Sequence, residues 1–378
     1  MSEFFIATMN LSYWEYKTWF SNIDFTIIGS GIVGLTCALE LQRQHPRAKI
    51  VVLEKGLLPQ GASTKNAGFA CFGSISEIRE DLNHHSEDEV LKLVQKRWDG
   101  IQLLRKNLGD KELDYQRWGG HELFVNADKA LYEDCLEHLD DINKLLLPVY
   151  NEPAFQPHPN QFGFKNIERN YITNPFEAQI NTGSMMYSLL QLVRASGVTI
   201  FNSMTLEAYS ETADGVVVKT SNLEFHTKKL LIATNGFASK LLKEQVQPAR
   251  AQVLITKPIK DLKIKGTFHL DRGYYYFRNI DNRILFGGGR NLDFKTEETT
   301  EMGLTTLIQN KLETLLKETI LPDIPFEIEQ RWSGIMGVGT KKRPIVKHLS
   351  NHVSCGVRLG GMGIAIGSLV GKELADMA

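Results

Sequence analysis

Three glycines near the amino terminus have the spacing of a backbone site for phosphate groups. Gly29, Gly31 and Gly34 form the pattern G-x-G-x-x-G, with Ser30, Ile32 and Val33 between them. The first glycine permits a tight turn, the second lets the backbone approach a pyrophosphate, and the third allows a helix to pack closely on a strand. Free N–H groups at the start of that helix then attract the negative phosphates. The pattern therefore predicts a dinucleotide site, although a glycine turn that only packs would look the same.

An acidic residue about 20 positions further on strengthens this prediction. Glu54 ends the apolar run KIVVLE at 49–54 and is followed by Lys55. A carboxylate at this place accepts hydrogen bonds from a ribose diol and disfavours a 2′-phosphate. The sequence thus indicates an adenosine dinucleotide, and not NADP.

The elements that position these residues form a β-α-β unit. We expect a buried strand at 24–29, a helix at 32–44 and a second strand at 49–54, which implies a parallel sheet with a right-handed crossover. Further strands are expected at 198–202, 215–220, 223–226, 229–234, 251–255, 274–278, 283–287 and 352–357. Helices are expected at 86–108, 128–147, 185–196 and from Gly363, and residues 148–175 are expected to be irregular.

A second glycine-rich segment distinguishes between FAD and NAD. The sequence RLGGMGIAIG at 358–367 opens the last predicted helix, and GASTKNAG at 61–68 directly follows the acidic strand. Small residues at both places let the backbone approach a broad flat ring such as isoalloxazine. The last helix would direct N–H groups at the ring edge where negative charge develops on reduction. FAD is therefore the better fit.

Several segments in a fixed order resemble the D-amino-acid oxidase superfamily of flavoproteins. They are DFTIIGSGIVGL, VVLEKG, GASTKNAG, LLIATNG, YYYFRNIDNRILFGGGRN, RWSGIMG and GGMGIAIGSLVG, and they span nearly the whole chain. The group that they most resemble contains the γ-glutamylputrescine oxidase-like enzymes, glycine oxidase and monomeric sarcosine oxidase. The ordered set is more specific than the glycine pattern alone.

The resemblance implies an α/β fold with two interleaved domains. A Rossmann-like FAD-binding domain of the glutathione-reductase type would comprise 1–80, 176–240 and 329–378, and a mixed α+β substrate domain with an antiparallel sheet would comprise 81–175 and 241–328. The residues expected to hold FAD are Gly29, Ser30, Gly31, Ile32, Val33, Gly34, Glu54, Lys55, Ser63, Asn66, Ala67, Gly68, Leu206, Ala233, Thr234, Asn235, Gly236, Gly360, Gly361, Met362, Gly363 and Ile364.

The chain departs from this group at three functional positions. Amino-acid oxidases of the group place a carboxylate-binding arginine where this chain has Gly334 to Gly337, without a cation. Ile335 stands where sarcosine oxidases attach flavin to a cysteine, and Ala365 stands where they keep a lysine. We therefore expect non-covalent FAD and a different means of binding the substrate.

Substrate residues are expected on the strand 274–278 and beside the two flavin loops. Side chains alternate along a strand, so Tyr275 faces away from Tyr274 and Tyr276, and one of these faces must meet the cavity. Arg278 and Arg290 have the chemistry to bind a carboxylate bidentately, and a surface ion pair is the alternative for each. The candidates for the catalytic site are Tyr275, Arg278, Trp332 and Arg358.

Composition excludes several other classes of protein. The 378 residues carry a net charge of -1, which gives no electrostatic basis for binding nucleic acid. No segment is apolar enough to span a membrane. The four cysteines are widely spaced, and His84-His85 has no partner at metal-ligand spacing, so we expect a reduced cytoplasmic compartment and no metal.

These observations together predict an FAD-dependent amine or amino-acid oxidase or dehydrogenase. It would oxidise the C–N bond of its substrate by hydride transfer to flavin N5, giving an imine, and pass electrons to oxygen or another acceptor. One alternative is a flavoprotein subunit or FAD-binding module without turnover of its own. The other is an NAD(P)H-dependent hydroxylase or reductase, which should show a second nucleotide-phosphate motif; none is present.

Overall fold

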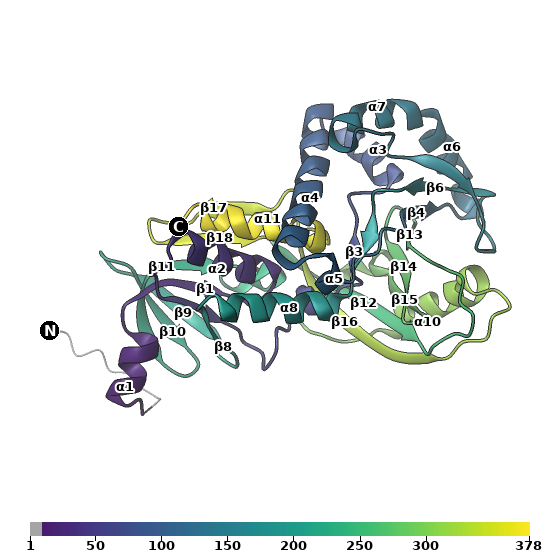
Figure 1. The fold of residues 1–378 in the computed structure, drawn as a ribbon. Helices are drawn as coiled ribbons and strands as arrows, with labels where there is room; N and C mark the ends of the chain where they lie inside the picture. Colours follow the sequence, from purple (N-terminus) through teal and green to yellow (C-terminus); the bar gives the residue numbers. More distant parts are fainter. Residues whose placement is uncertain (1–9) are drawn as a thin grey trace.

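The computed structural model describes residues 10–378, and two large sheets dominate it (Figure 1). A short aromatic helix, α1 (Tyr13–Glu15), continues through Tyr16–Phe20. Phe20 anchors this segment, because its ring stacks on Phe201 with the centroids 5.1 Å apart.

The first sheet is mainly parallel and has the order β17-β18-β11-β1-β2-β8. Its strands are β1 (Ile23–Ile28), β2 (Ile50–Leu53), β8 (Thr199–Phe201), β11 (Glu224–Ile232), β17 (Ile345–His348) and β18 (Val353–Val357). The antiparallel strands β9 (Leu206–Glu211) and β10 (Val216–Thr220) extend it from β11. β2 is buried along its whole length and β1 at every residue except Asp24, as strands covered on both faces must be.

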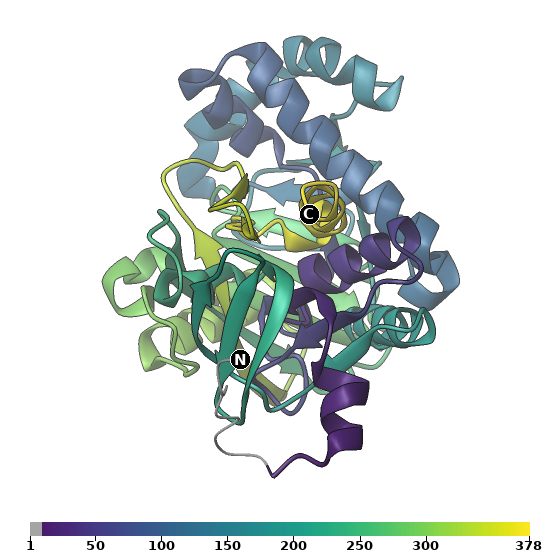
Figure 2. The ribbon, with the colours of Figure 1, turned by 90° about the vertical axis from the view of Figure 1, so that its left-hand side faces the viewer.

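Four helices pack beside this sheet, α2 (Ile32–Gln44), α4 (Glu87–Leu108), α8 (Thr182–Ala195) and α11 (Gly363–Ala375). Figures 1 and 2 show the C-terminal helix α11 next to α2 and α4. Glycines permit this close approach. A Cβ on Gly371 would lie 2.6 Å from the carbonyl oxygen of Val33, and one on Gly100 would lie 2.1 Å from that of Ala365. The amino-terminal ends of α2 and α11 are thereby held in one region.

The second sheet has the order β16-β12-β15-β14-β13-β4-β6-β5 and is antiparallel except for the pair β13 and β4. Its strands are β4 (Gly120–Leu123), β5 (Gln156–Pro159), β6 (Asn170–Asn174), β12 (Gln247–Thr256), β13 (Thr267–Leu270), β14 (Tyr275–Ile280), β15 (Arg283–Gly288) and β16 (Ile328–Val338). One register row runs across it through His269, Tyr276, Gly287, Val253 and Trp332. Directly paired residues point to the same face, so this row shares one side of the sheet.

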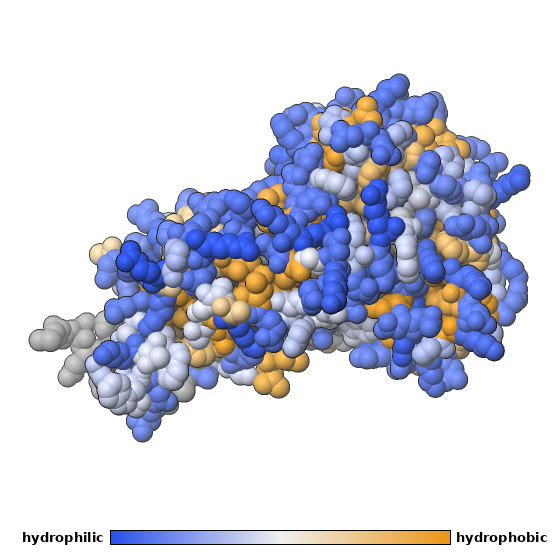
Figure 3. Space-filling view, in the orientation of Figure 1, coloured by the Kyte–Doolittle hydropathy of each residue, from blue (hydrophilic) through white to orange (hydrophobic). Residues whose placement is uncertain are grey.

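The remaining helices are α3 (Ile75–His84), α5 (Asp110–Leu113), α6 (Lys129–Glu137), α7 (Leu139–Tyr150), α9 (Phe294–Glu297) and α10 (Thr306–Leu315). A two-stranded ladder joins β3 (Phe69–Ala70) to β7 (Ala178–Gln179). Figure 3 shows a largely hydrophilic face with scattered apolar side chains. No helix in residues 10–378 has the length and apolar character to cross a membrane.

The predicted elements differ from the structure in a few places. The helix expected at 128–147 is two helices, α6 and α7, and the strands expected at 223–226 and 229–234 are one, β11. Residues 148–175, expected to be irregular, contribute β5 and β6 to the second sheet. Residues 329–338, assigned from sequence to the FAD-binding domain, form most of β16, which pairs with β12 in the antiparallel sheet.

Candidate functional site

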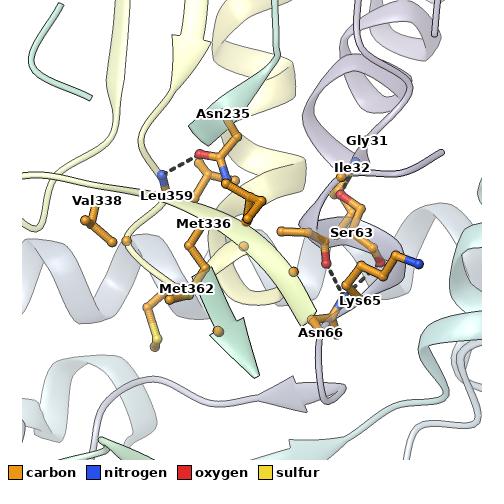
Figure 4. A pocket seen from close by; sticks show the side chains of 18 of the residues that line it. Gly31, Ile32, Ser63, Lys65, Asn66, Asn235, Met336, Val338, Leu359 and Met362 are labelled. Carbon is orange, nitrogen blue, oxygen red and sulfur yellow. Dashed lines mark hydrogen bonds between the residues drawn. The ribbon is translucent and has the colours of Figure 1, made fainter. Parts of the chain in front are cut away.

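A cavity of about 940 Å³ lies where the two sheets meet, and residues from both line it. On the side of the parallel sheet, its wall contains Gly29, Gly31, Ile32 and Val33, at the turn from β1 into α2. Helix geometry leaves the first N–H groups of α2 without intrahelical partners. Ser63 satisfies one of them, since its Oγ accepts a hydrogen bond from Ile32 N at 3.0 Å (Figure 4).

The carboxylate of Glu54 is hydrogen-bonded to the glycine turn between β1 and α2. Its Oε2 accepts hydrogen bonds from Ser30 N at 3.1 Å and from Ser30 Oγ at 2.8 Å, and its Oε1 accepts one from Gly56 N at 3.0 Å. A carboxylate has about four acceptor positions, so this one retains capacity for a ribose hydroxyl. Ser30 therefore fixes the carboxylate in place, which sequence spacing alone did not indicate.

The wall opposite Glu54 is apolar and carries two lysines, Lys55 and Lys240. Leu206 and Leu241 line it, and Lys55 Nζ lies 3.6 Å from the centroid of the Phe237 ring. Burial lowers the pKa of Lys55, against the attraction of Glu54. A flat heterocycle such as adenine fits such a surface.

The loop 61–68 is held in shape by hydrogen bonds of its own side chains. Asn66 Nδ2 donates to the carbonyl oxygens of Ala62 and Ser63, and Asn66 Oδ1 accepts from Gly68 N at 2.8 Å. From the other sheet, Trp332 Nε1 donates to Lys65 O at 2.9 Å. Ala67 at its tip packs against β12 and β15.

The glycine loop before α11 closes the cavity on the opposite side. Leu359 N donates to Asn235 Oδ1 at 3.2 Å (Figure 4), and Gly360 N donates to Gly337 O at 2.9 Å. Gly360 and Gly361 have φ values of +59° and +84°, which glycine adopts without strain. The loop leads directly into Gly363 and the N–H groups that open α11. Two helix amino termini, of α2 and α11, thus face one cavity.

The antiparallel sheet forms the third wall, and its lining is aromatic and cationic. Tyr276 and His269 lie on it, with Phe69 edge-on to both rings at centroid distances of 5.7 and 5.2 Å. Burial raises the pKa of Tyr276 to about 12, so its hydroxyl stays protonated at neutral pH. Arg290 also lines the cavity, and its guanidinium lies 4.8 Å from the centroid of the Phe294 ring.

Comparison with known proteins identifies this arrangement. Residues 24–377 match the FAD dependent oxidoreductase family. The chain belongs to this family. It is 22% identical to a probable oxidoreductase, OrdL, of Haemophilus influenzae, over 95% of this chain and 83% of the relative. It is 20% identical to the gamma-glutamylputrescine oxidoreductase of Escherichia coli, over 100% of this chain and 88% of that protein.

Solved structures share the fold. Glycine oxidase from Geobacillus kaustophilus superimposes with a TM-score of 0.75, at 19% identity and with 94% of each chain covered. L-proline dehydrogenase from P. horikoshii gives a TM-score of 0.74, at 16% identity, covering 94% of this chain and 92% of the other. The predicted class, an FAD-binding Rossmann-like fold with a second antiparallel sheet, is confirmed.

The cavity fits FAD in its chemistry. The N–H groups at the start of α2 can bind an anion such as the pyrophosphate. The backbone at Gly31 is free to approach that anion because this position has no side chain; a Cβ there would lie 2.9 Å from Ser63 Oγ. Of the 22 residues expected to hold FAD, 18 line the cavity; the other four, Ser30, Gly34, Gly68 and Gly236, lie behind it. Those four bring the lining segments together. A Cβ on Gly34 would lie 1.9 Å from Gly29 O, and one on Gly236 would lie 2.4 Å from Met336 O.

None of the four residues chosen from sequence as catalytic lines the cavity. Tyr275 is 5% exposed and belongs to the apolar core on the other face of β14, while Tyr274 and Tyr276 line the cavity. The expected alternation is present, but its phase was assigned to the wrong tyrosine. The role of an aromatic wall passes to Tyr276.

The other three candidates hold the walls in place from behind. Arg358 donates to the carbonyl oxygens of Arg343 and Gln245 at 3.0 to 3.2 Å, which ties the loop before β17 to the glycine loop. Trp332 holds Lys65 as described above. Arg278 is 2% exposed behind Gly68, and burial lowers its pKa to about 10. These residues are positioning residues in this structure.

Gly287 makes room for the Tyr276 ring, and this gives a first prediction. A Cβ on Gly287 would lie 2.6 to 2.8 Å from the ring and hydroxyl of Tyr276. Gly287→Val should therefore displace the ring and destabilise the protein by about 1–3 kcal/mol, as overpacking does. Thermal unfolding measures this. If the clash is the cause, Gly287→Val added to Tyr276→Ala should be nearly neutral; an undiminished loss there would contradict it.

Proposed function

We propose that this FAD-dependent oxidoreductase oxidises the C–N bond of a small amine or amino acid to an imine. Bound FAD would accept the hydride from the carbon beside nitrogen. The relatives named above include enzymes whose names refer to glycine, proline and gamma-glutamylputrescine, which are compounds with such a bond. The observation that carries the proposal is the aromatic wall of Tyr276 and Phe69 on the sheet face that meets the flavin loop.

This wall can do the work that such an oxidation needs from the protein. Holding a C–H bond in one orientation lowers the barrier by several kcal/mol, about 7 or more in the best cases. The aromatic rings exclude water from the reacting carbon. The raised pKa of Tyr276 makes its phenol a hydrogen-bonding group and not a base. The substrate amine would therefore arrive neutral or lose its proton to solvent.

Arg290 is the residue that we assign to a substrate carboxylate, in place of the arginine that the family's amino-acid oxidases have elsewhere. Burial lowers the pKa of Arg290, yet a guanidinium keeps its charge in proteins. Glu297 and Glu298 act on Arg290 electrostatically, but no carboxylate within residues 10–378 forms an ion pair with it, so its N–H groups are available to a substrate. Arg278, the other arginine expected from sequence for this role, does not line the cavity and lies next to Gly68.

Anaerobic titration with a panel of amines tests the function. Loss of the flavin's visible absorbance on adding an amine under nitrogen is the expected result. An FAD module without turnover would keep its absorbance with every amine. An NAD(P)H-dependent hydroxylase or reductase would instead be bleached by the nicotinamide, and it would need a second phosphate-binding motif that the sequence lacks.

We propose a cytoplasmic enzyme with oxygen or another acceptor reoxidising the flavin.

FAD is expected to be non-covalent, which is a second prediction. Ile335 occupies the family's tether position, and Cys71 is the one cysteine among residues 10–378 that lines the cavity. Burial raises the pKa of Cys71 well above its ordinary value, so it stays a thiol and a poor nucleophile. Acid precipitation should release all of the FAD into the supernatant. A yellow pellet would contradict the prediction, and Cys71→Ala would then show whether that residue is the attachment point.

A further inference from the structure

Glu77 brings a carboxylate to the cavity wall from the first turn of α3. Its Oε2 caps that helix by accepting a hydrogen bond from Ser74 N at 3.0 Å. Within residues 10–378, its Oε1 has no hydrogen-bond donor and the carboxylate has no ion-pair partner. The side chain lines the same cavity as Tyr276 and Arg290.

The surroundings of Glu77 keep its carboxylate ionised but provide no direct ion-pair partner. Burial alone would raise the pKa of Glu77, but the positive charges of Arg97 and Lys342 help to bring it below its ordinary value. These cations are engaged elsewhere: Arg97 Nη1 donates to Phe72 O at 2.6 Å, and Lys342 pairs with Asp81 at 2.6 Å. An ionised carboxylate facing a partly enclosed cavity is incomplete without a cationic partner.

His269 supplies an independent observation at the same place. Its side chain is 8% exposed and lines the cavity, and its Nε2 has no hydrogen-bond partner. Burial lowers the pKa of His269, against the attraction of Glu77, so the imidazole is neutral at neutral pH. A neutral imidazole offers one ring nitrogen as an acceptor. The two residues together therefore suit a group rich in N–H donors.

Sheet register gives the distance between this group and the flavin loop. Ala67 of that loop packs against Leu285 of β15, whereas His269 lies on β13, two strands away. Neighbouring strands are about 4.8 Å apart, so the separation across the sheet is roughly 10 Å. Tyr276 lies on β14, the strand between them, and its side chain lines the cavity within this interval. A short alkyl chain lying on that ring would connect the two ends.

We propose that Glu77 and His269 form a subsite for a second, non-reacting cationic group, so that the substrate is an amine carrying two basic groups. The proposal rests on the amine-oxidising function proposed above. The reacting nitrogen lies at the flavin end, and the other ammonium lies between the Glu77 carboxylate and the His269 imidazole. Charge-assisted hydrogen bonds of this kind are stronger than neutral ones.

The test compares pentane-1,5-diamine with 1-aminopentane, which differ only in the second amine. The FAD-loaded enzyme is first reduced with dithionite, so that it cannot oxidise either compound. Binding is then measured by the rise in melting temperature with amine concentration. The wild-type enzyme should bind the diamine at least tenfold more tightly. Glu77→Gln should remove this preference, because Gln keeps the cap on α3 but not the charge.

Two further variants make the outcome decisive. Glu89→Gln changes the equivalent capping residue of α4, away from the cavity, and should leave the preference intact. If Glu77→Gln does not fold, His269→Phe, which keeps a ring but no acceptor, should reduce the preference severalfold. An equal affinity for both amines in the wild type, or an unchanged preference in Glu77→Gln, would overturn the subsite. A Glu77-dependent preference without bleaching by any amine would support the subsite while refuting the oxidation.

Discussion

Gly31→Val is expected to yield a protein that purifies without FAD. A Cβ at this position would lie 2.9 Å from Ser63 Oγ, the atom that accepts the Ile32 N–H at the start of α2. The two methyl groups of valine would extend into the space where backbone must approach the pyrophosphate. FAD content per chain, measured by absorbance after purification, should fall from near one to near zero.

The choice of Gly31 separates binding from folding. Gly34 is also part of the motif, but its Cβ would lie 1.9 Å from a backbone oxygen, so any substitution there would disrupt the packing of β1 and α2. At Gly31 the obstacle is a movable side chain. Gly183→Val, at an exposed position near the start of α8, is the matched control and should remain yellow. A yellow Gly31→Val protein would refute the assignment of the motif to FAD.

The dinucleotide half of the site could be predicted because its signals are local. The bounds of β1, α2 and β2 agree with expectation to within one residue, since an apolar run, a glycine turn and an amphipathic helix each leave a short pattern in the sequence. Glu54 follows from the same unit. The role of Ser30 as its hydrogen-bond partner needed the structure, because a serine inside G-x-G-x-x-G has no pattern of its own.

The substrate half depended on information that the sequence does not contain. Alternation along 274–278 divides the tyrosines correctly between two faces, but only the packing of β14 shows which face meets the cavity. A shift of one residue exchanges the two faces of a strand completely. Glu77 and His269 were missed for a related reason. The capping box of Ser74 and Glu77 could have revealed the start of α3 from sequence, but only the fold brings α3 and β13 together at the cavity.

Positioning residues were mistaken for catalytic ones where they neighbour the flavin loops in sequence. Arg358 has a φ of +65° and directs its guanidinium at the carbonyl oxygens of two other loops. Trp332 lies in the register row of Tyr276 but uses its indole N–H to hold Lys65. Nearness in sequence to a cofactor loop predicts contact with the loop, which is a weaker statement than contact with the substrate.

Arg290→Met is expected to discriminate between amines with and without a carboxylate. Losing the charged partner of a buried carboxylate costs about 2 kcal/mol or more, so kcat/KM for norleucine should fall at least roughly thirtyfold. For 1-aminopentane, which has the same chain but no carboxylate, the change should be less than about threefold. Methionine keeps an aliphatic stem of similar length, and the contact of the guanidinium with the Phe294 ring is lost for both substrates alike.

Arg290→Lys supplies the control for charge alone. A lysine ammonium is a point charge without the planar fork of a guanidinium, so it should restore only part of the lost norleucine activity. Equal losses for norleucine and 1-aminopentane in Arg290→Met would contradict carboxylate binding and indicate a general disturbance of the wall formed by Tyr274 and Gly288 beside it.

Because Arg290 and Glu77 carry opposite charges in one cavity, Arg290→Met and Glu77→Gln should also fail with different substrates. Arg290→Met should lose the carboxylate-bearing compound, and Glu77→Gln should lose the diamine.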